Sequence, residues 1–477
     1  MSSEDLSVPC PLRMAALSTP EAPAVVGPQS TITYEELDGR VSAAAFRLRE
    51  LEPGSRVALY LPRDERYVIL MLAVIRAGHV ACPISDRLPP KGVAQLLEKA
   101  ACEALISEDE ELLRTAGTEL HGSKPESLLE VDGQRAGPAE IPLERHATII
   151  FTSGSTGTPK ATLHTFGNHY YNAIGSNANI ALRPGDRWLH SLPLYHVGGL
   201  SILFRCLLAG ATIALPEHGS PIGESIASLD ATHVSLVSTQ LQRLLRENNE
   251  LGGLKAVLMG GGPVAASLVD KAVSRGLPIH TSYGLTEMAS QVTTTPPGAS
   301  TGELRTSGRV LPHREVSVSE RGEILVRGET LFAGYVDGES LDLPSDAGCW
   351  FRTGDLGDLG GNGYLRVLGR KDNLFISGGE NIQPEEIEDA LCRLDGVDEA
   401  VVVPVPDREF GRRPVAFVRT EADPARFEDL ARALELVLPR FKIPVAFHGW
   451  AEESGEMKVD RASFQRRALR LHPDRRD

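Results

Sequence analysis

The stretch Thr152-Ser153-Gly154-Ser155-Thr156-Gly157-Thr158-Pro159-Lys160 follows directly on the apolar run 148–151. The run predicts a buried strand. The hydroxyls, glycines and lysine after it predict a loop whose N–H groups and positive charge surround a polyphosphate. It is not a Walker A loop, because no Gly-Lys-Ser/Thr sequence closes it. A solvated polar loop would account for the serines and glycines, but not for their density beside Pro159 and Lys160. We therefore interpret the stretch as a phosphate-binding loop.

Strand-like and helical segments alternate on both sides of this loop. Residues 56–61 form an apolar run and precede the amphipathic stretch 64–77, and a helical pattern at 170–180 follows the loop. This alternation predicts an α/β fold with largely parallel, buried strands. Beyond Gly302, short strands with glycine turns predict a small β-rich lobe.

The end of the chain has the pattern of a separate small domain. A glycine loop at 377–381 leads into a helix with Pro384 in its first turn, a position that proline favours. Strand-like runs at 400–405 and 413–420 and a helix at 426–438 follow. We therefore predict two domains, residues 1–371 and residues 372–477.

The composition excludes several classes of protein. The chain has 477 residues, and 49 Lys and Arg against 64 Asp and Glu give a net charge of −15. A surface of this sign repels the phosphates of nucleic acids, so we expect no nucleic-acid partner. The longest apolar run, residues 67–75, is far too short to span a bilayer, so we expect no integral membrane contact. The acidic start lacks an apolar signal core, which favours a cytoplasmic location.

Neither a disulfide framework nor a zinc site is expected. The six cysteines contain no C-x-x-C pair and predict small buried side chains. Four histidines lie within 33 residues of one another, namely His164, His169, His190 and His196. They lack a helical H-x-x-x-H pair with a third ligand, which favours structural or substrate-binding roles over zinc.

Three further motifs could complete a nucleotide site. The glycines in 259–263 would let the backbone approach a flat ring closely. Residues 282–287, Ser-Tyr-Gly-Leu-Thr-Glu, offer an aromatic plane, a hydroxyl and a carboxylate, and 353–355, Thr-Gly-Asp, present a carboxylate suited to two sugar hydroxyls. Each motif alone is ordinary loop chemistry. Their joint occurrence favours a nucleotide site.

These motifs resemble, in order and spacing, those of the adenylate-forming enzymes, which comprise acyl-CoA and aryl-CoA ligases, nonribosomal peptide adenylation domains and luciferases. FTSGSTGTPK, SYGLTE, FRTGDLG and GRKDN are similar to that family's phosphate loop, adenine motif, ribose motif and hinge motif. The resemblance covers nearly the whole chain. It implies a large N-terminal domain of stacked α/β sheets plus a distorted β-barrel, and a smaller, mobile C-terminal α+β domain.

The resemblance also implies ATP, Mg²⁺ and the co-substrate CoA, and a role for each motif residue. A substrate carboxylate attacks the α-phosphorus and pyrophosphate departs, so catalysis is mainly positioning plus positive charge. Thr152 and Glu287 would act in catalysis, and Glu287 would hold Mg²⁺. Asp355 and Arg370 would take the ribose hydroxyls, and Tyr283 would stack on the adenine. The other nucleotide-binding residues implied are Ser153, Gly154, Ser155, Thr156, Gly157, Lys160, Gly261, Gly262, Pro263, Ser282, Gly284 and Thr286.

The family supplies one more catalytic cation from a lysine near the C-terminus, which here corresponds to Lys458. Met457 occupies the position of the family's usual glycine, so this chain departs from the pattern there. For the second half-reaction, family members rotate the C-terminal domain about a hinge, which the pattern places at Asp372. The loop with Ser377, Gly378 and Gly379 would then border the tunnel for the CoA thiol.

A second resemblance indicates which carboxylic acid is the substrate. The stretch 192–205, from LPLYHVGGL to Arg205, resembles the o-succinylbenzoate-CoA ligases, the menaquinone-pathway branch of the family. That substrate has one carboxylate to activate and a second, on the benzene ring, that needs a partner when buried. The resemblance assigns Arg205 to the second carboxylate, and Tyr195 and His196 could wall the ring.

Three alternatives stay open. The acid could be another aromatic or medium-chain carboxylic acid, since every ATP motif would be the same. The chain could bind adenylate without completing catalysis, or deliver the acyl group to a carrier protein instead of free CoA. A homo-oligomer is possible.

Overall fold

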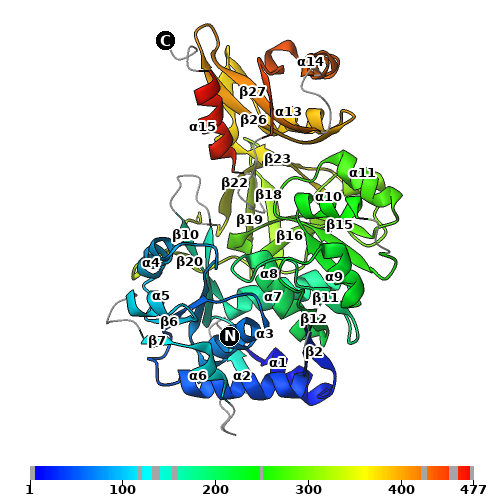
Figure 1. The fold of residues 1–477 in the computed structure, drawn as a ribbon. Helices are drawn as coiled ribbons and strands as arrows, with labels where there is room; N and C mark the ends of the chain where they lie inside the picture. The colour runs from blue at the N-terminus through cyan, green and yellow to red at the C-terminus, as the bar shows by residue number, and fades with distance from the viewer. Residues whose placement is uncertain are drawn as a thin grey trace.

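The fold was analysed in a computed structural model that describes residues 6–28, 30–115, 121–130, 140–152, 159–247, 251–346, 348–420, 427–450 and 460–472. It is mixed α/β, with several sheets and a small C-terminal domain, as expected from the sequence (Figure 1). No helix in these ranges is long and apolar enough to cross a membrane.

Two large sheets form the body of the molecule. One has the order β21 (Ser340–Asp342), β20 (Gly334–Asp337), β10 (Lys160–Thr165), β9 (His146–Thr152), β5 (Val80–Pro83), β4 (Arg56–Tyr60), β6 (Ala104–Ser107), β7 (His121–Ser123). The other has the order β17 (Arg309–Val310), β16 (Ser290–Thr294), β15 (Ile279–Leu285), β14 (Ala256–Met259), β13 (His233–Leu236), β11 (Arg187–Leu189), β12 (Thr212–Ala214), β2 (Pro23–Val26), β3 (Thr31–Thr33). The central strands of both are parallel; antiparallel strands lie at one edge of the first sheet and at both edges of the second.

Helices join the two sheets through one apolar core. The largest buried cluster combines residues of α2 (Tyr34–Leu48), α3 (Glu65–Ala77) and α8 (Val197–Ala209) with strand residues of both sheets. The apolar run noted in the sequence lies in α3, which is buried along its length because it packs between these layers. The other helices of the body are α1 (Pro11–Ser18), α4 (Pro90–Lys99), α5 (Glu110–Thr115), α6 (Pro125–Leu129), α7 (Phe166–Asn179), α9 (Ile222–Ser228), α10 (Ser238–Arg246), α11 (Ala266–Ser274) and α12 (Thr301–Leu304).

The β-rich lobe predicted after Gly302 is a four-stranded antiparallel sheet of β18 (Arg314–Val318), β19 (Glu323–Gly328), β22 (Phe351–Leu359) and β23 (Leu365–Arg370). A bridge between Arg309 and Tyr364 joins it to the edge of the larger sheet. A small pair, β1 (Ser7–Pro9) and β8 (Glu140–Pro142), lies near the N-terminus.

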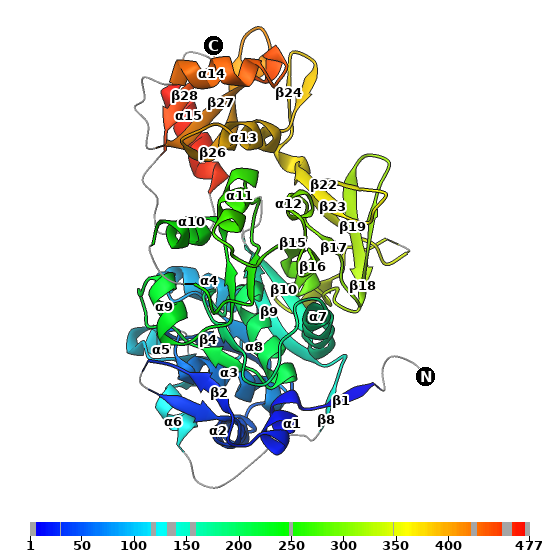
Figure 2. The ribbon, with the colours of Figure 1, turned by 90° about the vertical axis from the view of Figure 1, so that its right-hand side faces the viewer.

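The C-terminal domain lies at one end of the molecule, beyond β22 and β23 (Figure 2). It has the hairpin β24 (Phe375–Ser377) and β25 (Glu380–Ile382), the sheet β26 (Val397–Asp407), β27 (Gly411–Thr420), β28 (Phe447–Gly449), and the helices α13 (Pro384–Cys392), α14 (Phe427–Glu435), α15 (Arg461–Leu471). Two apolar clusters of its own fill it. This domain therefore has an independent core.

Candidate active site

The predicted phosphate-binding loop connects two antiparallel neighbours. Thr152 ends β9 and pairs with Lys160, the first residue of β10, so the loop leaves and re-enters the same sheet. Ser153, Gly154, Ser155, Thr156 and Gly157 lie outside the described residues, as do Met457 and Lys458. The two described ends of the loop are thus fixed by strand pairing.

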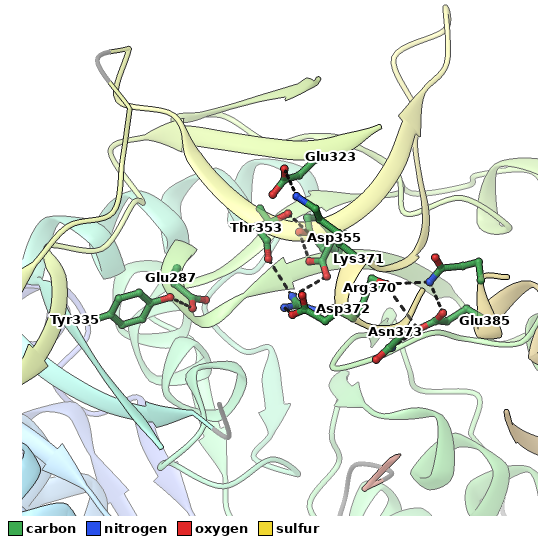
Figure 3. Close-up of polar contacts among 12 residues, drawn as sticks. Glu287, Glu323, Tyr335, Thr353, Asp355, Arg370, Lys371, Asp372, Asn373 and Glu385 are labelled. Carbon is green, nitrogen blue, oxygen red and sulfur yellow. Dashed lines mark hydrogen bonds and ion pairs between the residues drawn. The ribbon is translucent and has the colours of Figure 1, made fainter. Parts of the chain in front are cut away.

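Asp355 lies at the centre of a hydrogen-bonded group. Its carboxylate accepts from the Tyr283 hydroxyl at 2.7 Å and from Arg370 Nη1 at 2.9 Å. Arg370 Nη1 also donates to the Thr353 carbonyl oxygen at 3.0 Å (Figure 3). Burial and the nearby Asp355 charge raise the pKa of Tyr283, so its hydroxyl stays protonated and is a donor. Tyr283 and Arg370, which are far apart in the sequence, therefore meet at one carboxylate.

Glu287 lies in the one-turn helix η2 (Thr286–Met288), directly after β15. Its Oε1 accepts a 2.6 Å hydrogen bond from the Tyr335 hydroxyl, as Figure 3 shows. Lys160 Nζ lies 4.5 Å from the centroid of the same Tyr335 ring. One tyrosine thus lies between the lysine of the predicted phosphate loop and the predicted metal-binding carboxylate.

A buried histidine fixes the backbone before Glu287. His164 is fully buried, and its Nε2 lies 2.7 Å from the carbonyl oxygen of Thr286. Burial lowers the pKa of His164 to about 4, so the ring is neutral at pH 7 and donates through Nε2. The backbone of the Glu-bearing turn is therefore tied to β10.

The glycines around the predicted adenine site serve different purposes. Gly261, Gly262 and Pro263 are exposed in the loop after β14, and Gly261 has a φ of 82°. Gly284 is a close-approach glycine, because a Cβ there would collide with the carbonyl of Ser290 on the paired strand. Ser282 Oγ donates to the Met259 carbonyl at 2.6 Å and so connects the two motifs.

The predicted hinge residue Asp372 lies in the one-turn helix η3 (Lys371–Asn373), between β23 and the C-terminal hairpin. Its carboxylate lies 3.6 Å from Arg370 Nη2, and Lys371 Nζ lies 3.4 Å from Glu323 Oε2 (Figure 3). Arg370 thus contacts both Asp355 and Asp372.

The predicted CoA loop is a tight hairpin turn. Gly378 and Gly379 join β24 to β25 with φ values of 58° and 88°, which side chains rarely adopt. Ser377 is buried, and its Oγ has no hydrogen-bond partner among the described residues. The Gly378 N–H donates to the Phe410 carbonyl at 2.9 Å, which fixes the turn to the tip of β26 and β27.

The predicted acid-binding residues differ in exposure. Tyr195 is half-buried and His196 exposed, and their rings meet edge to face with centroids 4.8 Å apart. Arg205 is 1% exposed and lies on α8 with its guanidinium carbon 4.0 Å from the centre of the Trp188 ring. The structure therefore places Arg205 deep in the body rather than on its surface.

The donor set is suited to a metal that arrives with a nucleotide. Among the described residues, no group of three or more His, Cys, Asp or Glu side chains is placed to hold a metal ion. Mg²⁺ in phosphate-transfer sites is usually bound by one or two carboxylates, substrate phosphates and water. A single carboxylate at Glu287, close to the end of the predicted phosphate-binding loop at Lys160, fits that pattern.

The sequence motifs do not predict the contact of Tyr335 with Glu287 or that of His164 with Thr286. Tyr335 lies in the stretch beyond Gly302 for which only a β-rich lobe was predicted, and it is 48 residues from Glu287 in the chain. No local pattern connects the two, so the pairing of β20 with β10 was the missing information.

Comparison with known proteins gives a consistent result for both parts of the chain. Residues 12–336 match the family model "AMP-binding enzyme", and residues 386–453 match "AMP-binding enzyme C-terminal domain". The chain is 33% identical over 458 residues to a 2-succinylbenzoate-CoA ligase of Bacillus licheniformis, covering 92% of this chain and 95% of that one.

Solved structures give the same picture. The o-succinylbenzoate CoA synthetase of Bacillus subtilis, in complex with the acyl-adenylate intermediate OSB-AMP, superposes with a TM-score of 0.86 at 30% identity, covering 96% of this chain and 98% of that one. The same B. subtilis enzyme in complex with ATP and magnesium ion gives a TM-score of 0.83 at 31% identity, with 93% and 96% covered.

Proposed function

We propose, from the premise that this chain belongs to the AMP-binding enzyme family and within it to the 2-succinylbenzoate-CoA ligases, that it is an ATP-dependent acid-thiol ligase. It converts o-succinylbenzoate, ATP and CoA to o-succinylbenzoyl-CoA, AMP and pyrophosphate through an acyl-adenylate. The observation that carries the proposal is that the likeness to these ligases extends over both domains. We place the reaction in the cytoplasm, where ATP and CoA are available together.

In the first half-reaction, a carboxylate oxygen of the acid attacks the α-phosphorus of ATP and pyrophosphate leaves. The loop from Thr152 to Lys160 holds the β- and γ-phosphates. Asp355 and Arg370 bind the ribose hydroxyls, and Tyr283 stacks on the adenine beside Gly261. Asp355 suits this task because its carboxylate can still accept hydrogen bonds beyond those from Tyr283 and Arg370.

Glu287 is the residue that would hold Mg²⁺. When bound, the ion supplies positive charge to the phosphate oxygens as pyrophosphate departs. Tyr335 and the turn anchored by His164 hold the Glu287 carboxylate in place. Lys458 supplies a further positive charge at the reacting phosphorus.

The second half-reaction needs a different group at the same centre. The sulfur of CoA attacks the acyl carbonyl, the bond to the phosphate oxygen breaks, and AMP leaves. We propose that residues 372–477 turn as a domain about Asp372, which withdraws Lys458 and brings Ser377, Gly378 and Gly379 to the thiol path.

The acid pocket is formed by Tyr195, His196 and Arg205. The two rings flank the benzene ring of the substrate, and Arg205 recognises the carboxylate that is not activated. The burial of Arg205 supports this assignment, because a buried positive charge interacts strongly with an anion.

A panel of acids tests the function. The protein is mixed with ATP, Mg²⁺ and CoA and, in separate reactions, o-succinylbenzoate, benzoate or hexanoate, and products are identified by mass spectrometry. We expect the CoA ester and AMP with o-succinylbenzoate far in excess of the others. Equal turnover of hexanoate or benzoate would assign the chain to a different acid.

Lys458→Ala separates a ligase from a protein that only binds adenylate. We expect adenylate formation to fall by roughly 10³-fold, since the positive charge acts on the transition state, while ATP binding stays measurable. Lys442→Ala in the same domain, which removes a surface ion pair to Glu386, is the matched control. Unchanged adenylation in Lys458→Ala would refute the role of Lys458.

A further inference from the structure

The guanidinium of Arg205 is buried without an acidic partner. It donates to Asn177 Oδ1 at 3.0 Å, to Gln291 Oε1 at 3.2 Å and to the Ile180 carbonyl at 3.4 Å. All three acceptors are neutral, and no carboxylate within the described part of the chain forms an ion pair with it. Burial lowers the pKa of Arg205 to about 9, which reflects the cost of a charge held away from water.

A second buried arginine increases the positive charge of this region. Arg314 is 5% exposed, and it donates to the Pro312 carbonyl at 2.9 Å and to the Gln291 carbonyl. Burial and the nearby charge of Arg205 lower the pKa of Arg314 to about 9. Two guanidinium groups therefore meet at the same glutamine, and neither has an ion-pair partner among the described residues.

Both polar atoms of the Gln291 side chain form hydrogen bonds. Its Oε1 accepts from Arg205, and its Nε2 donates to Thr294 Oγ1 at 2.6 Å. Its backbone carbonyl accepts from Arg314 and from Asn172 Nδ2 at 3.1 Å. The residue is 5% exposed and lies on β16, opposite Gly284 of β15. The position of the Arg205 charge is thereby coupled to the strand that leads to Glu287.

A glutamate of the same shape would fit this position and give Arg205 a counter-charge. A carboxylate beside a buried guanidinium forms a strong pair when hydrogen-bonded. Glutamine supplies the acceptor without the charge. The positive charge of Arg205 thus remains available to an anion that enters with the substrate.

We propose that Gln291 is a specificity-determining residue, which orients the buried guanidinium of Arg205 without neutralising it and so leaves its charge for the second carboxylate of a dicarboxylic substrate. The inference rests on the proposed function and deepens it, since it names a residue that makes the enzyme prefer a diacid. Gln291 acts through Arg205, so it is a positioning residue and need not touch the substrate.

The test compares two acids that differ by one group. These are o-succinylbenzoate and 4-oxo-4-phenylbutanoate, which has hydrogen in place of the ring carboxylate. For Gln291→Glu we expect kcat/KM with the diacid to fall about 100-fold, mainly through KM, while kcat/KM with the monoacid changes by less than about threefold. The preference of the enzyme for the diacid would then be lost.

Gln291→Met is the matched control, because it has a similar length, no charge and no acceptor oxygen. It should lower kcat/KM for the diacid less than Gln291→Glu does and change the monoacid little, so the diacid stays preferred, since Arg205 loses one acceptor and keeps its unpaired charge. A residue that only stabilises the fold would instead affect both acids in parallel in both variants. That result, or a lost diacid preference in Gln291→Met, would overturn the inference, and Gln291→Met keeps the test decisive should Gln291→Glu fail to fold.

Failure of the inference and failure of the proposed function are distinguishable in this experiment. A wild-type protein that prefers the diacid, together with a Gln291→Glu variant that prefers it equally, overturns the inference alone. A wild-type protein that does not ligate o-succinylbenzoate overturns the proposed function, and the role of Gln291 with it.

Discussion

Tyr335 connects two residues that sequence motifs assign to separate tasks. Its hydroxyl donates to Glu287 at 2.6 Å, and Lys160 Nζ lies over its ring. Burial and the Glu287 charge raise the pKa of Tyr335, so the hydroxyl remains a donor throughout the physiological range. At the scale of single residues, the carboxylate proposed to hold Mg²⁺ is thus oriented by a side chain from strand β20.

Tyr335→Phe removes this hydrogen bond and leaves the ring in place. We expect the Mg²⁺ concentration for half-maximal adenylate formation to rise by roughly 10-fold, the size typical of losing an outer partner of a metal ligand. Binding of ATP titrated with Mg²⁺, followed by calorimetry, should show the same shift without turnover.

Tyr364→Phe is the control for this prediction. Tyr364 is buried whereas Tyr335 is half-buried, and the Tyr364 hydroxyl donates to Glu303 at 2.5 Å, so it is a second tyrosine-glutamate pair away from the site. An equal change of the Mg²⁺ requirement in both variants would mean that Tyr335 acts only on stability.

At the scale of elements, the hairpin of β24 and β25 is set by its two turn glycines. Gly378 has a φ of 58°, and a Cβ there would lie 2.7 Å from Phe410 Cδ1. Gly378→Ala combines a left-handed backbone, which costs roughly 1–2 kcal/mol, with that collision. We expect slower transfer of the acyl group to CoA, measured from preformed acyl-adenylate, and an unchanged rate of adenylate formation.

Gly396→Ala provides the comparison for the hairpin. Gly396 has a φ of 82° in the same domain, but the nearest atom to its Cβ is Thr420 Oγ1 at 3.9 Å. The Gly396→Ala variant therefore introduces the energetic cost of the left-handed backbone without a collision of the new Cβ. Loss of both half-reactions in Gly378→Ala would show general destabilisation instead of a role in thiol transfer.

The sequence predicted the helices and strands better than the side-chain contacts between them. The apolar run 148–151 lies in β9, and the helix expected at 170–180 is α7, which begins earlier because Thr165 and Asn168 form a capping box. The local pattern of apolar and polar residues was enough to predict this strand and this helix. The pairs Tyr335 with Glu287 and Arg205 with Gln291 could not be predicted, because strand pairing and helix packing bring residues 48 and 86 positions apart together.

At the scale of the whole molecule, a few polar contacts fix the C-terminal domain against α10 and α11. Arg246 Nη2 lies 2.8 Å from Asp398 Oδ2, and Gln242 Nε2 donates to the Asp398 carbonyl at 2.9 Å. Ser267 Oγ donates to the Cys392 carbonyl at 2.8 Å. Such contacts can be exchanged at low cost, which is compatible with a domain that turns during each catalytic cycle.

We predict that this orientation of the C-terminal domain serves the first half-reaction. Asp398→Arg would place two positive charges at the contact with Arg246 and disfavour the orientation. Because the Arg246 side chain is 57% exposed, we expect only about a threefold slower adenylate formation at low salt. The effect should shrink as salt screens the charges. Transfer to CoA from preformed adenylate should not slow.

The double reversal Arg246→Asp with Asp398→Arg restores opposite charges and should return adenylate formation to within about twofold of wild type. Pyrophosphate release without CoA measures the first step, and thioester formation from added acyl-adenylate measures the second. If Asp398→Arg slowed the second step more than the first, this orientation would belong to thiol transfer. If the double reversal failed to recover the first step, the ion pair would not be what holds the domain.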